Sequence, residues 1–153
     1  MNHARRCFLA GCSGVLMAPL AVPRASAEEA DTLTPAIREV TGGAPLKTGR
    51  VTLEIPRIAD NGNAVPLKVS VESAMTAQDH VRSIHLLSEK NPRTVMARFF
   101  LGPRAGKAQI NTRVRLNGTQ HIVAVAAMSD GSYWSGTAEV DVTESACYDA
   151  TNP

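Results

Sequence analysis

The stretch AQINTRVRLNGTQHIVAVAAMSDGS, residues 108–132, decides the fold. Apolar and polar residues alternate from 107 to 116, which predicts a β-strand with one buried face. Asn117-Gly118 predicts a tight turn. Residues 120–128 are apolar on both faces, as expected of a central strand, and residues 129–132 predict the turn of a hairpin. Two neighbouring strands of an antiparallel sheet are therefore expected here.

The same two-residue periodicity recurs on both sides of this stretch. Turn clusters separate the runs at residues 60–63, 91–92 and 102–103. In chain order, we expect strands at residues 51–55, 65–71, 81–89, 95–101, 107–116, 120–128 and 134–142. Seven short strands at spacings of about ten residues predict an all-β, immunoglobulin-like seven-stranded β-sandwich.

A short helix is expected before the first strand, at residues 33–40. Thr34 is the expected N-cap and Pro35 the first helical residue, while Gly42-Gly43 predicts the end of the helix. Residues 28–143 are then one β-sandwich domain, with no repeat or linker inside it.

The first 27 residues have the features of an export signal. Arg5-Arg6 followed by apolar residues is the pattern of the twin-arginine (Tat) pathway, and Ala25-Ser26-Ala27 is a small-residue cleavage site. The apolar run is too short for a membrane span. A lipoprotein site at Cys12 is the alternative, but the run continues beyond it to Val22. We therefore expect a periplasmic protein whose mature chain starts at Glu28.

Composition excludes nucleic acid as an expected partner. The chain has 16 Lys and Arg and 14 Asp and Glu. Three of the basic residues lie before Ala27, so 13 basic and 14 acidic residues remain, a net charge of −1. Binding to phosphates needs a concentrated basic surface.

No metal, cofactor or catalytic site is expected from the remaining polar residues. His80, His85 and His121 lie in or beside expected strands and have no second cysteine to complete a zinc site. Gly42-Gly43 lacks the residues of a phosphate-binding loop. Met75, Met96 and Met128 are interpreted as core residues, and Trp134 likewise.

One cysteine remains after residue 27, and it lies beyond the last expected strand. In an oxidising compartment cysteines normally pair as disulfides, so a single leftover thiol indicates a reactive group or an intermolecular partner. The alternative is that Cys147 is an incidental residue near a chain end.

The chain resembles the SoxY family, the sulfur-carrier subunits of the bacterial thiosulfate-oxidising system. The resemblance covers about Leu33 to Cys147. Its most specific pieces are residues 58–66 (IADNGNAVP), Ile84-His85 with residues 89–92 (EKNP), and residues 123–132 (VAVAAMSDGS). It implies a domain that pairs with a SoxZ-like β-sandwich subunit to form a heterodimer. Its C-terminal cysteine would present sulfur intermediates to periplasmic sulfur-oxidation enzymes.

The flexible C-terminal arm, residues 144–153, departs from the family's Gly-Gly-Cys-Gly-Gly pattern. Ser145 and Ala146 precede Cys147, and Tyr148 and Asp149 follow it, which resembles SoxY-related paralogues whose arm reads Ala-Ala-Cys-Ile-Glu. Only Cys147 carries over as the sulfur attachment residue. The flanking residues have less backbone freedom than glycine, and the nearby carboxylates disfavour the thiolate.

These observations lead to two hypotheses of different classes. The first is a non-enzymatic sulfur carrier of thiosulfate oxidation, on which partner enzymes do the chemistry. The second is a periplasmic immunoglobulin-like interaction domain in which Cys147 is structural or forms an interchain disulfide.

Overall fold

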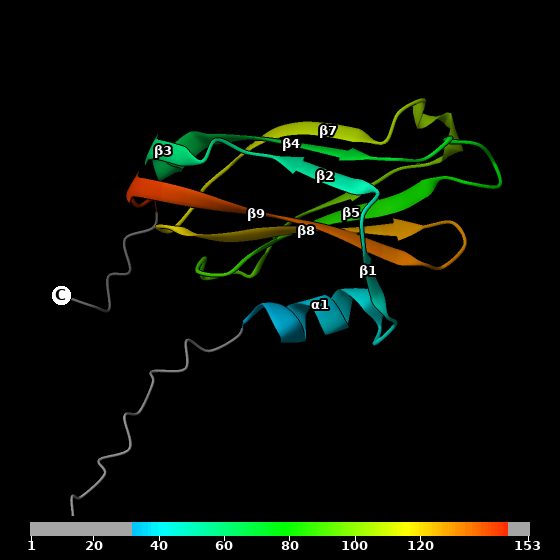
Figure 1. Ribbon diagram of the computed structural model, residues 1–153, viewed down its shortest axis with the longest axis horizontal. Coiled ribbons are helices and arrows are strands. Elements are labelled where there is room, and N and C mark those ends of the chain that lie inside the picture. The colour runs from blue at the N-terminus through cyan, green and yellow to red at the C-terminus, as the bar shows by residue number, and fades with distance from the viewer. Residues whose placement is uncertain (1–31, 147–153) are drawn as a thin grey trace, which may run out of the picture.

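The computed structural model describes residues 32–146 as two β-sheets and one α-helix (Figure 1). The all-β expectation with a short N-terminal helix is confirmed. Nine strands lie in this part of the chain, two more than the sequence predicts. The additional strands are β1 (Leu46–Thr48) and β3 (Ile58–Asn61), and the second half of β3 lies in the residues predicted as a turn.

The larger sheet contains six strands. Five follow the order β1-β9-β8-β5-β6, and β3 pairs with β9 alone. Four of these are long: β5 (Val81–Ser88), β6 (Val95–Phe100), β8 (Gln120–Met128) and β9 (Tyr133–Glu144). They pair antiparallel, whereas β1 and β3 both run parallel to β9.

The smaller sheet has the order β2-β4-β7, with antiparallel pairing throughout. Its strands are β2 (Val51–Glu54), β4 (Val65–Val71) and β7 (Gln109–Val114). β4 shows the alternation expected from the sequence, because its even-numbered residues are more exposed than their buried odd-numbered neighbours.

The main core lies between the two sheets. Side chains from both meet there, among them Val69 of the small sheet and Ile84 and Ile122 of the large one, all fully buried. Met75 and Met128 belong to this core as predicted, while Trp134 is half-buried at its margin. The Trp134 ring lies 5.4 Å from Lys47 Nζ and 5.1 Å from the guanidinium carbon of Arg50, so two cations cover it.

The helix α1 (Leu33–Thr41) covers the outer face of the large sheet (Figure 1). Ala36 of the helix packs with Leu87 of β5 and with Val123 and Val125 of β8. This second small core explains why β8 is apolar on both faces: one face meets the small sheet and the other meets α1. The central position predicted for β8 is confirmed, since β5 and β9 flank it.

The helix starts at Leu33, as the predicted span of 33–40 has it, but the predicted N-cap is wrong. Thr32, not Thr34, stands at the N-cap position, and its hydroxyl donates to the carbonyl of Glu89 instead of capping the helix. Pro35 is consequently the third helical residue. The predicted end is confirmed, because Gly42 adopts the left-handed conformation of a C-cap at φ 63°.

The turn predicted at residues 60–63 is only partly correct. Asp60 and Asn61 end strand β3, and a single 3-10 turn, η1 (Gly62–Ala64), follows it. The Asn61 side chain accepts a hydrogen bond from the Asn63 N–H, which starts this turn. Within the described residues no helix is long and apolar enough to cross a membrane.

Candidate functional site

The candidate site is the end of the molecule at which β9 finishes. β9 pairs with β8 up to Val140, and from Asp141 onward it pairs with β3 on its other side. The last pair joins Asn61 to Glu144, so the strand is longer than the predicted 134–142 and includes the first residue of the expected arm. Figure 1 shows β3 and this end of β9 together at one end of the sandwich.

Two hydrogen bonds hold the residues that follow β9. The N–H of Ala146 donates to the carbonyl of Leu116 over 3.0 Å. The hydroxyl of Ser145 donates to the side-chain oxygen of Asn117. The first residues of the expected flexible arm are therefore attached to the turn after β7. We call Gly62, Leu116, Asn117, Ser145 and Ala146 the tail anchor.

Gly62 allows this close approach. Its carbonyl accepts from the N–H of Leu116 over 2.9 Å. A Cβ atom on Gly62 would lie 2.4 Å from the Leu116 carbonyl oxygen and 3.1 Å from Ala146 N. Any residue other than glycine would therefore push the anchored chain away.

Asparagine side chains connect the anchor to the loop between β5 and β6. Asn91 accepts from the N–H of Asn117 over 2.9 Å and donates to the carbonyl of Arg115 over 2.8 Å. Asn117 in turn donates to the carbonyl of Lys90. The buried Gln120 donates to Asn91 as well. The three loops at this end are thus one hydrogen-bonded unit.

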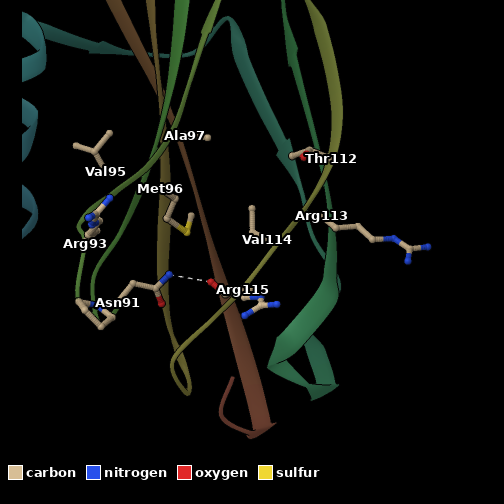
Figure 2. A pocket seen from close by; sticks show the side chains of 10 residues that line it. Asn91, Arg93, Val95, Met96, Ala97, Thr112, Arg113, Val114 and Arg115 are labelled. Atoms are coloured by element: carbon tan, nitrogen blue, oxygen red, sulfur yellow. Dashed lines mark hydrogen bonds between the residues drawn. The ribbon is translucent and has the colours of Figure 1, made fainter. Parts of the chain in front are cut away.

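A cavity of about 490 Å³ lies beside the anchor, between β6 and β7. Figure 2 shows Met96 and Val114 directed into the space between the strands and Arg113 directed away from it. The dashed line in that figure is the bond from Asn91 to the Arg115 carbonyl. The residues that line the cavity are Asn91, Pro92, Arg93, Val95, Met96, Ala97, Thr112, Arg113, Val114 and Arg115.

A second polar contact joins Glu89, in the loop after β5, to His121 of β8. The imidazole Nδ1 and the backbone N of His121 both lie 3.0 Å from one carboxylate oxygen of Glu89. Hydrogen bonds from the His121 backbone and side chain hold the pKa of Glu89 below its ordinary value. Glu89 therefore stays ionised where it fixes the strand end.

Only some of the predicted site residues lie within residues 32–146. Ser145 is exposed and Ala146 half-buried, and both belong to the tail anchor. Cys147, Tyr148 and Asp149 lie outside the described residues. Covalent geometry alone places the Cα of Cys147 about 3.8 Å from that of Ala146. The thiol is therefore attached one residue beyond a fixed point of the sandwich.

Sequence reasoning missed Gly62, Asn91 and Asn117 as residues of this site. A signal was present, because Gly62 and Asn91 lie within the two motifs that carry the resemblance, residues 58–66 and 89–92. Their convergence on the tail was not visible from spacing. Within residues 32–146, no group of three or more His, Cys, Asp and Glu is arranged to hold a metal ion.

The fold and the site define a β-sandwich protein that holds a cysteine-bearing C-terminal tail at one end. The model of the family described as sulfur oxidation protein SoxY matches residues 37–147, so the match ends on Cys147. This chain belongs to the SoxY family. Among curated proteins, none matches it.

Solved structures agree with this assignment. The sulfur carrier protein SoxY from Chlorobium limicola f thiosulfatophilum is 27% identical, with a TM-score of 0.61 over 72% of this chain and 96% of that chain. A putative superoxide reductase from Thermotoga maritima matches with 20% identity and a TM-score of 0.56, over 65% of this chain and 95% of that one. A superoxide reductase (neelaredoxin) from Ignicoccus hospitalis matches at 18% identity and a TM-score of 0.55, over 61% and 80%. The two reductases share the fold alone, whereas the SoxY match and the family model together indicate a carrier protein of sulfur oxidation.

Proposed function

We propose that this protein is a periplasmic covalent carrier of sulfur intermediates, with Cys147 as the attachment residue. The observation that supports it most is the family match that ends on Cys147, one residue beyond the tail anchor. The anchor holds Ser145 and Ala146 at one end of the sandwich, directly before the attachment residue.

The chemistry of loading requires a partner. Joining the Cys147 thiol to thiosulfate forms an S–S bond and releases one proton and two electrons. The electrons must pass to an acceptor that belongs to a partner oxidoreductase. This chain supplies the thiol and its position, and the enzymes it meets supply the redox chemistry.

The leader supports a periplasmic location for this exchange. Arg5-Arg6 is a twin-arginine motif, and Ala25-Ser26-Ala27 is a cleavage site that produces a mature chain starting at Glu28. A SoxZ-like subunit is the proposed permanent partner.

A single measurement tests attachment and export together: the intact mass of the protein isolated from its native periplasm, before and after reduction. We expect a chain that starts at Glu28 and carries sulfur-containing additions, which reductant removes. Cys147→Ser should have the same mature N-terminus and no addition. Ser145→Ala, a neighbouring change that keeps the thiol, should keep the additions.

Two results would contradict the carrier function. Additions that persist in Cys147→Ser would place the sulfur elsewhere. A mass of two chains that reductant halves would support the interaction domain with an interchain disulfide. A chain that begins at a lipid-modified Cys12 would contradict cleavage after Ala27.

A further inference from the structure

The cavity beside the tail anchor lies where the sandwich is open. β6 ends the strand order of the large sheet and β7 ends that of the small sheet, so neither strand has a paired neighbour on this side within residues 32–146. Met96, Ala97 and Val114 form an apolar floor between them (Figure 2). Burial of such a floor by another apolar group is favourable in water.

The rim of the same cavity is cationic. Arg93 lies on the side of β6 and Arg115 on the side of β7, and both line the cavity. Among the residues of 32–146 that line the cavity, none is acidic. The cavity therefore fits a group with an apolar body and a negative charge next to it.

The C-terminal tail starts at this rim. The N–H of Ala146 donates a hydrogen bond to Leu116, the residue after Arg115. The Ser145 hydroxyl donates to Asn117, and the N–H of Asn117 donates to the cavity residue Asn91. Tyr148 follows two residues later and can lie up to about 7 Å from Ala146 along the backbone. A sphere of 490 Å³ is about 10 Å across. The tail thus starts beside the residue that follows Arg115 of the cavity rim, two residues before the tyrosine.

We propose that the cavity between β6 and β7 is the docking site of this chain's own tail, with the Tyr148 ring on the Met96 and Val114 floor and the Asp149 carboxylate at the arginine rim. Tyr148-Asp149 combines an aromatic ring with a neighbouring negative charge, which matches the cavity in size and in charge. The tail outside the described residues is attached at the right place, so docking costs little chain entropy.

Docking would change the setting of the thiol. Cys147 would be held between the anchored Ala146 and the docked Tyr148, and Asp149 would be paired with an arginine instead of opposing the thiolate. A partner enzyme would have to displace Tyr148 to draw the thiol out. The position of the tail does not depend on what Cys147 carries, so a failure of this proposal and a failure of the sulfur-carrier function are distinguishable.

Methyl NMR of methionine tests the docking. Residues 28–153 contain three methionines, Met75, Met96 and Met128, and two of these lie in the core away from the cavity. In the chain labelled with ¹³C at its methionine methyl groups, the docked ring should shift the Met96 signal upfield. Tyr148→Leu should remove that shift and leave the Met75 and Met128 signals in place. Asp149→Asn should reduce the upfield shift of the Met96 signal in part, and Thr151→Ala should leave this shift unchanged.

Three results would overturn the proposal. If the Met96 signal has the same position in Tyr148→Leu as in the unchanged protein, the Tyr148 ring does not lie on Met96. An upfield shift that disappears on dilution would assign the cavity to the tail of a second copy. A Met96 shift that arises only when a partner subunit is added would assign it to that partner.

A covalent trap gives a second, independent readout. With Cys147→Ser in both chains, Met96→Cys with Tyr148→Cys should close an intramolecular disulfide under mild oxidation. The matched pair Gln109→Cys with Tyr148→Cys, at the far end of β7, should not close. Failure of the first pair to close in a folded monomer would contradict docking.

Discussion

At the residue scale, His85 is a half-buried side chain whose two ring nitrogens differ in their hydrogen bonding. Its Nε2 lies 3.0 Å from the Ser83 hydroxyl, while its buried Nδ1 has no hydrogen-bond partner within residues 32–146. Burial, and secondarily the charge of Arg98 on β6, lower the pKa of His85 below its ordinary value. Glu39 of α1 lies 3.6 Å from Arg98 and offsets part of that charge. The folded protein therefore favours neutral His85.

This predicts a loss of stability in mild acid. The unfolded chain begins to protonate His85 near its ordinary pKa of about 6.5, whereas the folded chain resists protonation. The free energy of unfolding should be highest above that pH and should fall between pH 7 and 5.5. His85→Gln should reduce this dependence when urea unfolding is measured at both pH values. An identical pH dependence in His85→Gln would contradict the assignment. Glu89 and Asp130, whose pKa values are lowered, remain ionised in this range.

At the element scale, the end of β9 depends on one small residue in a turn. β3 pairs in parallel with β9, and the turn η1 follows β3. Gly62 of that turn accepts a hydrogen bond from Leu116, and a Cβ atom there would lie 3.1 Å from Ala146 N. Parallel strands need a long connection between them, and β3 and the end of β9 are about 80 residues apart in sequence. The position of the tail anchor is a property of these elements together.

Gly62→Ala should therefore damage the anchor. The added Cβ would meet the Leu116 carbonyl oxygen at 2.4 Å. We expect a loss of about 1–3 kcal/mol in the free energy of unfolding, typical of overpacking, and faster hydrogen exchange at the Ala146 amide. Gly102→Ala is the matched control, because its Cβ would have no heavy atom within 4 Å. If both changes lowered the free energy of unfolding equally, or if the Ala146 amide stayed protected from exchange in Gly62→Ala, the anchor would not depend on the space at Gly62.

At the scale of the whole molecule, the two ends of the sandwich differ. The tail anchor and its cavity lie at one end. Phe100 ends the edge strand β6 at the other, with 80% of its surface exposed. An exposed aromatic residue on an unpaired edge strand is a favourable contact for another subunit. We therefore expect the SoxZ-like subunit to bind along β6 at this end, which leaves Cys147 outside the interface.

Phe100→Ser should weaken that heterodimer. Loss of a central aromatic contact typically costs at least 1–2 kcal/mol, a rise in Kd of about tenfold or more. Ile58→Ser, which changes the other large exposed apolar side chain (66% exposed) at the tail end, should leave Kd nearly unchanged. Binding of purified subunits by calorimetry measures both. A larger effect of Ile58→Ser would place the interface at the tail end.

The amino-acid sequence by itself determined the strands and turns that local periodicity encodes. Alternation along β4 and β7 and the two apolar faces of β8 predicted the buried sides correctly, because each depends on neighbouring residues. Gly42 and Gly131 predicted a helix end and a hairpin turn, since both need a left-handed conformation (φ 63° and 81°). The cysteine that ends the family match was also visible in the sequence.

Only the tertiary structure decided what surrounds the start of the tail. Three features join residues far apart in sequence: the parallel pairing of β3 with β9, the hydrogen bonds of Leu116 with Gly62 and Ala146, and the Asn91–Asn117 bond. No local period encodes such contacts. No Lys or Arg follows Arg115 in the chain, so sequence reasoning assigned the thiol an acidic setting. The fold brings the Leu116 carbonyl against the Ala146 N–H, so Arg115 is the sequence neighbour of the residue that holds Ala146, because contacts between loops are set by the packing of the whole sandwich.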